Sequence, residues 1–209
     1  AEMFSLRAAS VNFEPFFARC ELDTHADTCA LGRNFTPLSF TGRVCDVSPY
    51  SSEQYESEKN VPIITGATAY TCQESGQTFI LVVNEGLWLG PKMSHSLLNP
   101  NQMRYNGVTV HDNPFDPHNP LSVEHDEVTL PLSISGTNIF LDTRTPTQHE
   151  LDNCPHLHLT SEAEWNPQTV RLASTQSVEA EVIDNLDELD PGLSQISSVY
   201  CFSEMAENL

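Results

Sequence analysis

Hydrophobic and polar positions in the middle of the chain alternate over short stretches, as they do in β-strands. The stretches are rich in β-branched and aromatic residues and are separated by polar residues. They lie at 44–47 and 61–64, which flank a long polar stretch at 48–60, and then at 68–72, 78–83, 108–110, 127–130 and 138–141. Ser75-Gly76, between the third and fourth stretches, is typical of a hairpin turn. The pattern therefore predicts an all-β fold.

Helix signals are few and short. Asn99 is a good N-cap, Pro100 suits the first helical position, and Gly107 suits the position just past the end. These residues predict a helix of about two turns over 100–106. Ser161, with a glutamate three residues later, has the spacing of a capping box and predicts a second short helix.

The chain is strongly acidic. Its 209 residues hold 9 Lys and Arg against 29 Asp and Glu, a formal charge of −20. This charge repels polyanions and excludes nucleic acid and anionic membranes as direct partners. Residues 173–209 contain eight of the acids and no Lys or Arg. We expect this acidic tail to be partly disordered.

The sequence carries no sign of export or membrane insertion. The longest apolar run, 79–83, is far shorter than the roughly 18 residues that a membrane helix needs. The first residues do not have the pattern of a secretory signal. The six cysteines contain no C-x-x-C pair and are expected to be free thiols. These features predict an intracellular, cytoplasmic location.

One segment has the composition of a catalytic site. Asp23 and Thr24 follow the apolar Leu22, and the small Ala26 comes just after them. An aspartic protease needs an acid directly after a strand, with a hydroxyl beside it and small residues around it. Two such carboxyl groups about 3 Å apart cannot both ionise, so they share one proton. The charged member then activates water, while the protonated member donates to the peptide carbonyl oxygen.

At these residues the sequence resembles the retropepsin-like protease region of copia-type retrotransposon polyproteins. The first motif that carries the resemblance is Asp23-Thr24-His25-Ala26, and the second is Leu97-Leu98-Asn99 followed by the predicted helix. His25 stands where the family has Gly. The resemblance covers about 17–145.

The resemblance implies a small closed or orthogonal barrel with one or two short helices. Asp23 would be the catalytic acid and base, and Thr24 would support it. Because one such motif is present, the active site would need two copies of the chain, hence a homodimer. Segments 44–47 and 61–64 would form a flap over a peptide of the polyprotein, and no cofactor is needed. The remaining ranges are a leader at 1–16 and an extension at 146–209.

Other interpretations remain open. A Cβ and an imidazole at position 25 must be accommodated in a tight turn, so the chain is alternatively an inactive module for interaction or assembly. Asp23, His25 and Asp27 alternate along the chain and suit a divalent metal, as do His156 and His158, which would make a metallohydrolase.

A second acid within one chain is the remaining alternative. Asp142 and Thr143 also follow an apolar run, Ile139-Phe140-Leu141. No small apolar turn follows them, so we interpret this segment as the end of the last core strand.

Overall fold

The computed structural model describes residues 14–48 and 56–170. The chain divides into two units after Gln168, and the fold given below is that of the first unit. Its described residues form twelve strands and two six-residue helices. The strands are β1 (Phe17–Leu22), β2 (Ala30–Gly32), β3 (Thr36–Val47), β4 (Glu58–Thr71), β5 (Thr78–Gly90), β6 (Ser96–Leu98), β7 (Thr109–His111), β8 (Ser122–His125), β9 (Val128–Pro131), β10 (Ser133–Ser135), β11 (Asn138–Arg144) and β12 (His156–His158). The helices are α1 (Pro100–Tyr105) and α2 (Gln148–Asn153).

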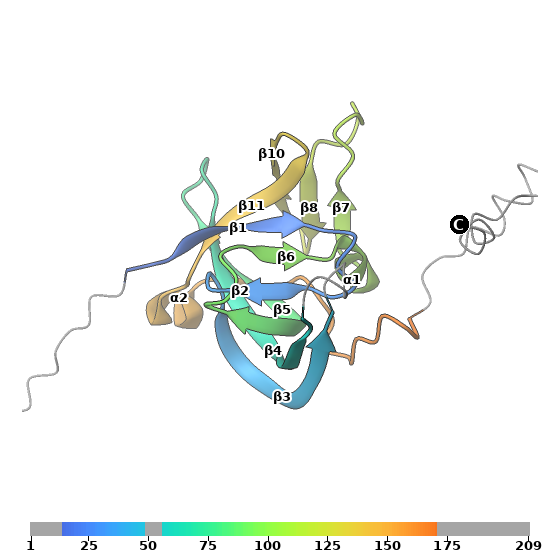
Figure 1. The fold of residues 1–209 in the computed structure, drawn as a ribbon. Coiled ribbons are helices and arrows are strands. Elements are labelled where there is room, and N and C mark those ends of the chain that lie inside the picture. The colour runs from blue at the N-terminus through green and yellow to red at the C-terminus, as the bar shows by residue number, and fades with distance from the viewer. Residues whose placement is uncertain (1–13, 49–55, 171–209) are drawn as a thin grey trace, which may run out of the picture. The chain divides into compact units, whose positions relative to one another are not determined.

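Two sheets account for all strands in the described part of the chain. The larger has the order β10-β11-β1-β6-β2-β5-β4-β3, with β12 also pairing with β5 and β11 also meeting β4 at Arg144 and Ala69. The smaller has the order β7-β8-β9. Figure 1 shows the larger sheet as the body of the unit, with β3 curving along one end. The predicted all-β class is confirmed.

The three longest strands cover four of the predicted strands and extend them. β3 contains 44–47 and β5 contains 78–83, while 61–64 and 68–71, predicted in two separate strands, lie on the single strand β4. Segments 44–47 and 61–64 lie on β3 and β4 and pair antiparallel, with Val44 opposite Pro62 and Cys45 opposite Val61. The expected loop is shorter than 48–60, because β4 already begins at Glu58. Its tip at 49–55 lies outside the described residues.

β6 lies between β1 and β2, an arrangement that the hydrophobic pattern did not predict (Figure 1). It pairs parallel with β1, where Leu22 is opposite Leu98, and antiparallel with β2, where Ala30 is opposite Leu97. β1 and β2 are consecutive in the chain, yet a strand from far along the sequence separates them. The loop that joins β1 to β2 must therefore pass over the end of β6.

One predicted helix is confirmed and the other is wrong. Asn99 caps α1 by accepting hydrogen bonds from the backbone of Asn101 and Gln102. No helix forms at Ser161, whose hydroxyl instead accepts a hydrogen bond from the Ala163 backbone at 3.1 Å. The capping box forms earlier, at the start of α2, between Thr147 and Glu150.

The packed unit continues past residue 145, where the sequence placed the end of the domain. After α2, β12 pairs with Ile80, Leu81 and Val82 of β5. Leu157 and Leu159 are buried in the main hydrophobic core. Residues 146–160 are therefore part of the folded unit. Most of the expected leader, residues 1–13, and the whole acidic tail, residues 173–209, lie outside the described residues.

Neither described helix is long and apolar enough to cross a membrane. The five cysteines in the described ranges, at 20, 29, 45, 72 and 154, are all free thiols, as expected.

Candidate functional site

The two motifs that suggested a protease lie side by side. Asp23 comes directly after β1, and its backbone N–H donates to the Leu98 carbonyl oxygen at 3.0 Å. The parallel register of β1 and β6 continues to this point. The Asp23 side chain is 30% exposed and open to solvent. A carboxyl group at a strand end is thus presented beside the start of α1.

Residues 23–29, called here the Asp23 loop, are held by the first turn of α1. The Asn99 side chain caps the helix with its oxygen and donates its N–H to the Ala26 carbonyl. Gln102 accepts a hydrogen bond from the Cys29 backbone at 2.8 Å. The cap predicted from the sequence therefore has a second role, because one amide fixes both the helix and the loop.

The exposed tip of the Asp23 loop consists of Thr24 and His25. The His25 backbone N–H donates to Asp23 Oδ1 at 2.8 Å, and its imidazole Nδ1 lies 3.9 Å from the same oxygen. His25 does not have a positive φ, and its side chain is 91% exposed. His25 is therefore accommodated at the tip of this loop without a positive φ.

The candidate metal ligands do not come together. Within the ranges 14–48 and 56–170, no three His, Cys, Asp or Glu side chains are placed to hold a metal ion. His156 and His158 point outward from β12, on either side of the buried Leu157. The metallohydrolase interpretation gains no support from this placement.

Asp142 is not positioned to pair with Asp23 in one chain. It lies on β11 opposite Arg19, and the two side chains approach to 3.9 Å. Arg19 is four residues before Asp23 on β1, roughly 13 Å along an extended strand. The side chain of Asp142 is 75% exposed, while its neighbour Thr143 is buried.

Beneath the end of β1 lies a fully buried set of polar side chains, called here the neutral cluster. Its members come from β1, β6, β11 and the turn after β2: Cys20, Asn34, Ser96 and Thr143. Asn34 donates to Thr143 Oγ1 at 2.8 Å and accepts from Ser96 Oγ at 2.6 Å. Burial raises the pKa of Cys20 to about 11, so this thiol stays uncharged. The cluster links β1, which leads into Asp23, to its neighbours β6 and β11 and to the turn after β2.

β5 contains a β-bulge that the sequence reasoning missed. Val83 pairs with Gly66 and Gly86 pairs with Ile64, so Asn84 and Glu85 together face the single residue Thr65. Glu85 has a φ of 55°, a left-handed conformation that is uncommon for a residue other than Gly. The glutamate is only 6% exposed. A Gly at this position would have indicated an irregular backbone, but the sequence has Glu here.

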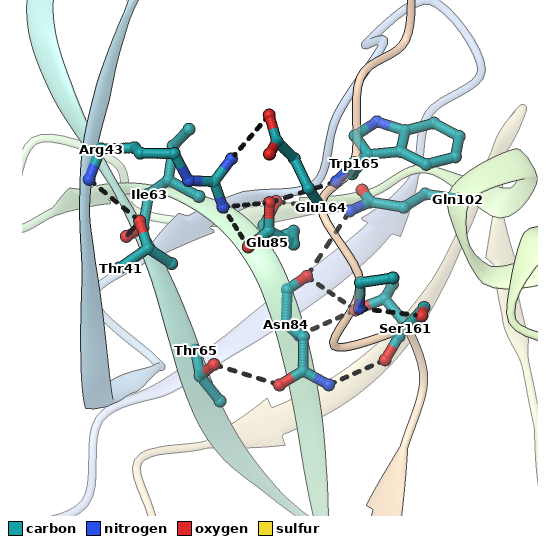
Figure 2. A network of polar contacts seen from close by, with 12 residues as sticks. Thr41, Arg43, Ile63, Thr65, Asn84, Glu85, Gln102, Ser161, Glu164 and Trp165 are labelled. Carbon is teal, nitrogen blue, oxygen red and sulfur yellow. Dashed lines mark hydrogen bonds and ion pairs between the residues drawn. The ribbon is translucent and has the colours of Figure 1, made fainter. Parts of the chain in front are cut away.

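An ionic cluster surrounds this bulge (Figure 2). Arg43 of β3 reaches both carboxylate oxygens of Glu85, at 2.5 and 2.6 Å. It also lies 3.4 Å from the carboxylate of Glu164. The hydrogen bond to Glu85 raises the pKa of Arg43. We call Arg43, Glu85, Glu164 and Trp165 the ionic cluster.

Residues 159–166, called here the strap, run along the bulge after β12. The Thr160 hydroxyl accepts from the Asn84 backbone N–H at 2.7 Å, and the Asn84 side chain donates to the Thr160 carbonyl at 2.8 Å. Further along, the Trp165 backbone N–H donates to Glu85 at 3.2 Å. The Trp165 indole N–H donates to the Asp27 carbonyl at 2.9 Å. The strap therefore connects the bulge to the Asp23 loop.

Comparison with family models, curated proteins and solved structures finds no match for this chain.

Proposed function

We propose that this chain is an aspartic endopeptidase domain of a retrotransposon polyprotein, with a retropepsin-like fold and an active site shared by two copies. The observation that carries the proposal is the position of Asp23. Asp23 directly follows β1, and its backbone N–H donates a hydrogen bond to Leu98 of the second motif. The side chain of Asn99, the N-cap of α1, hydrogen-bonds to the Asp23 loop. Asp23 and Leu98 are 75 positions apart, so no local structure explains this contact; the contact fits the order of motifs in the family that the sequence resembles.

The proposed chemistry needs a second carboxyl group, which another copy of the chain supplies. When two Asp23 loops meet across a two-fold axis, the two carboxyl groups share one proton. The charged group takes a proton from water, which attacks the peptide carbonyl carbon. The protonated group donates to the carbonyl oxygen, and the tetrahedral intermediate then collapses as the leaving amine takes up a proton. The Thr24 hydroxyl, exposed beside Asp23, is available to support the pair across the axis.

The β3–β4 hairpin supports the same proposal. Its two strands are antiparallel and long, and they carry the segments 44–47 and 61–64 that are expected to form a flap over a bound peptide. An extended peptide of the polyprotein would lie between this hairpin and the Asp23 loop, paired through its backbone. The free thiols of the described part suit the intracellular, reducing location that we also propose.

The decisive experiment incubates a longer precursor, or peptides cut from it, with the full chain. We expect Asp23→Asn to lower the cleavage rate by about a thousandfold. The substitution keeps an oxygen that can accept the His25 N–H, so the loop should remain folded. Asp142→Asn, at an exposed carboxylate away from the loop, is the matched control and should cleave normally. Cleavage that survives Asp23→Asn contradicts the proposal, and cleavage abolished by a chelator favours the metallohydrolase.

Subunit mixing tests the shared site. Co-refolding equal amounts of normal and Asp23→Asn chains gives dimers of which only about a quarter have two aspartates. Activity at constant total chain should therefore fall to about a quarter. A fall to one half would mean that each chain works alone.

The alternative function is an inactive retropepsin-like module for interaction or assembly. The exposed imidazole of His25 favours it, because this bulk lies on the loop that would face the partner chain. His25→Gly separates the two. Cleavage by the normal chain supports the protease. A folded dimer that cleaves only after His25→Gly, or not at all, supports the inactive module.

A further inference from the structure

Several hydrogen bonds anchor the Asp23 loop, and of those described above only the one from Trp165 comes from outside the range that resembles a protease. The first anchor is the hydrogen bond from the Asp23 backbone N–H to the Leu98 carbonyl, and the second is the hydrogen bond from the Asn99 side chain to the Ala26 carbonyl. The third is the indole N–H of Trp165 on the Asp27 carbonyl. The first two hold the beginning and middle of the loop, and Gln102 holds its end at Cys29. Trp165 holds Asp27, between the middle and that end.

Trp165 is itself fixed from two sides. Its backbone N–H donates to the buried carboxylate of Glu85. Its ring meets Tyr105 of α1 edge-on, with centroids 5.5 Å apart. Figure 2 shows the strap passing beside Glu85 with the indole turned toward the helix that carries Gln102. A ring held at both its backbone and its edge presents its N–H in one direction.

The bulge explains why the strap stays in place. Asn84 and Glu85 are buried, and the irregular backbone leaves ladder groups that β4 cannot pair. Thr160 and Gln102 supply these partners, since Thr160 bonds both the N–H and the carbonyl of Asn84 and Gln102 reaches the Glu85 carbonyl at 3.3 Å. A left-handed Glu is strained, and such strain persists where the surroundings over-determine it.

We propose that Trp165 is a positioning residue for the Asp23 loop, and that the strap ties this loop to the β3–β4 hairpin through Glu85 and Arg43. The chain of contacts runs from Asp27 to Trp165, to Glu85, and to Arg43 on β3. The loop and the hairpin would lie on opposite sides of a bound peptide, so the strap sets their separation. The catalytic consequence rests on the proposed protease function; the positioning of the loop does not.

The test compares Trp165→Phe with Trp88→Phe in the full chain. Phenylalanine keeps a ring beside Tyr105 but removes the indole N–H, and Trp88, half-buried beside the core, is the matched control. Amide hydrogen exchange of peptides covering 24–29 should become about two- to tenfold faster in Trp165→Phe, the range expected for one lost hydrogen bond. Exchange at 78–83 should not change, and Trp88→Phe should not speed exchange at 24–29 selectively.

A second measurement separates positioning from stability and from substrate contact. In peptide cleavage, Trp165→Phe should lower kcat by a similar factor and leave KM unchanged. Unchanged exchange at 24–29, or an equal increase throughout the chain, overturns the proposal. A higher KM with unchanged kcat also overturns it, because Trp165 would then contact the substrate. If the normal chain shows no Asp23-dependent cleavage, the protease function fails, and the exchange data alone decide whether Trp165 positions the loop.

Discussion

Two buried polar clusters flank the Asp23 loop, and they are built in opposite ways. The neutral cluster has no charge, is fully buried, and consists of residues within the range predicted as the domain. The ionic cluster centres on the buried carboxylate of Glu85. It reaches solvent through Arg43, which is 37% exposed, and it includes Glu164 and Trp165 of the strap. A buried neutral cluster whose hydrogen bonds are all made holds its strands in one arrangement. The half-open ionic cluster connects β3, the bulge of β5 and the strap.

The largest difference should come from the neutral cluster. Asn34→Leu keeps a similar volume but removes the amide oxygen that accepts from the buried Ser96 hydroxyl and the amide N–H that donates to the Thr143 hydroxyl. We expect the free energy of unfolding to fall by about 3 kcal/mol, measured by urea denaturation at neutral pH. Asn119→Leu, in an exposed loop, is the control and should change it by less than about 0.5 kcal/mol. Equal effects in the two variants would show that the neutral cluster has no special weight.

A smaller loss is expected from the ionic cluster. Arg43→Gln leaves the Glu85 carboxylate buried without its cation, and should lower the free energy of unfolding by about 2 kcal/mol. Lys59→Gln breaks an exposed ion pair with Asp46 on the same hairpin and should cost less than about 0.5 kcal/mol.

Salt should distinguish the two clusters. Repeating the denaturation of Arg43→Gln in about 1 M NaCl should narrow its difference from the normal chain, because screening weakens the partly exposed pair. The Asn34→Leu difference should stay the same. If salt affects both variants equally, the contrast between a neutral and an ionic cluster is wrong.

The smallest effect extends the comparison to a second ion pair. Arg144 and Thr147 hydrogen-bond to Glu150 and, with Arg144 contributing most, lower the pKa of this carboxyl group from its usual 4.5 to about 2. Because the folded pKa is depressed, the stabilisation is fully present above about pH 4.5 and is lost as the pH falls through 2. Glu150→Gln should cost about 1 to 2 kcal/mol at pH 6 and almost nothing at pH 2, measured by thermal or urea unfolding. A difference that persists unchanged at pH 2 would contradict this account.

Structural features were predictable from the sequence where a single residue type meets a requirement of the backbone close to it. Asn99, Pro100 and Gly107 gave the helix, because a cap, a missing N–H and a positive φ are each local requirements. The composition predicted strands at 44–47 and 61–64 but not where these strands end. β3 and β4 continue beyond the apolar segments, because their polar residues also pair through the backbone. Ser161 does not cap a helix, because Thr160 and Trp165 on either side of it hydrogen-bond to Asn84 and Glu85 in the bulge of β5.

The candidate site divides in the same way. Asp23 and Asn99 were found from the sequence because they occur in two motifs in a given order. Trp165 was not expected to reach the Asp23 loop, because it lies more than a hundred residues away and follows the predicted boundary at 145. Glu85 gave no signal, since a left-handed glutamate is stable only through Arg43 and the strap.

By itself, the sequence determined the all-β class, the capped helix and the acid that follows β1. Alternation and capping depend on neighbouring residues, and the acid was found from the residues directly beside it and from the order of two motifs along the chain. The tertiary structure alone decided that β6 separates β1 from β2 and that the strap reaches the Asp23 loop. Both are long-range pairings, and their hydrogen bonds form only when the core has brought distant segments together. The residues next to Trp165 in the sequence therefore do not predict that its indole N–H donates to the Asp27 carbonyl.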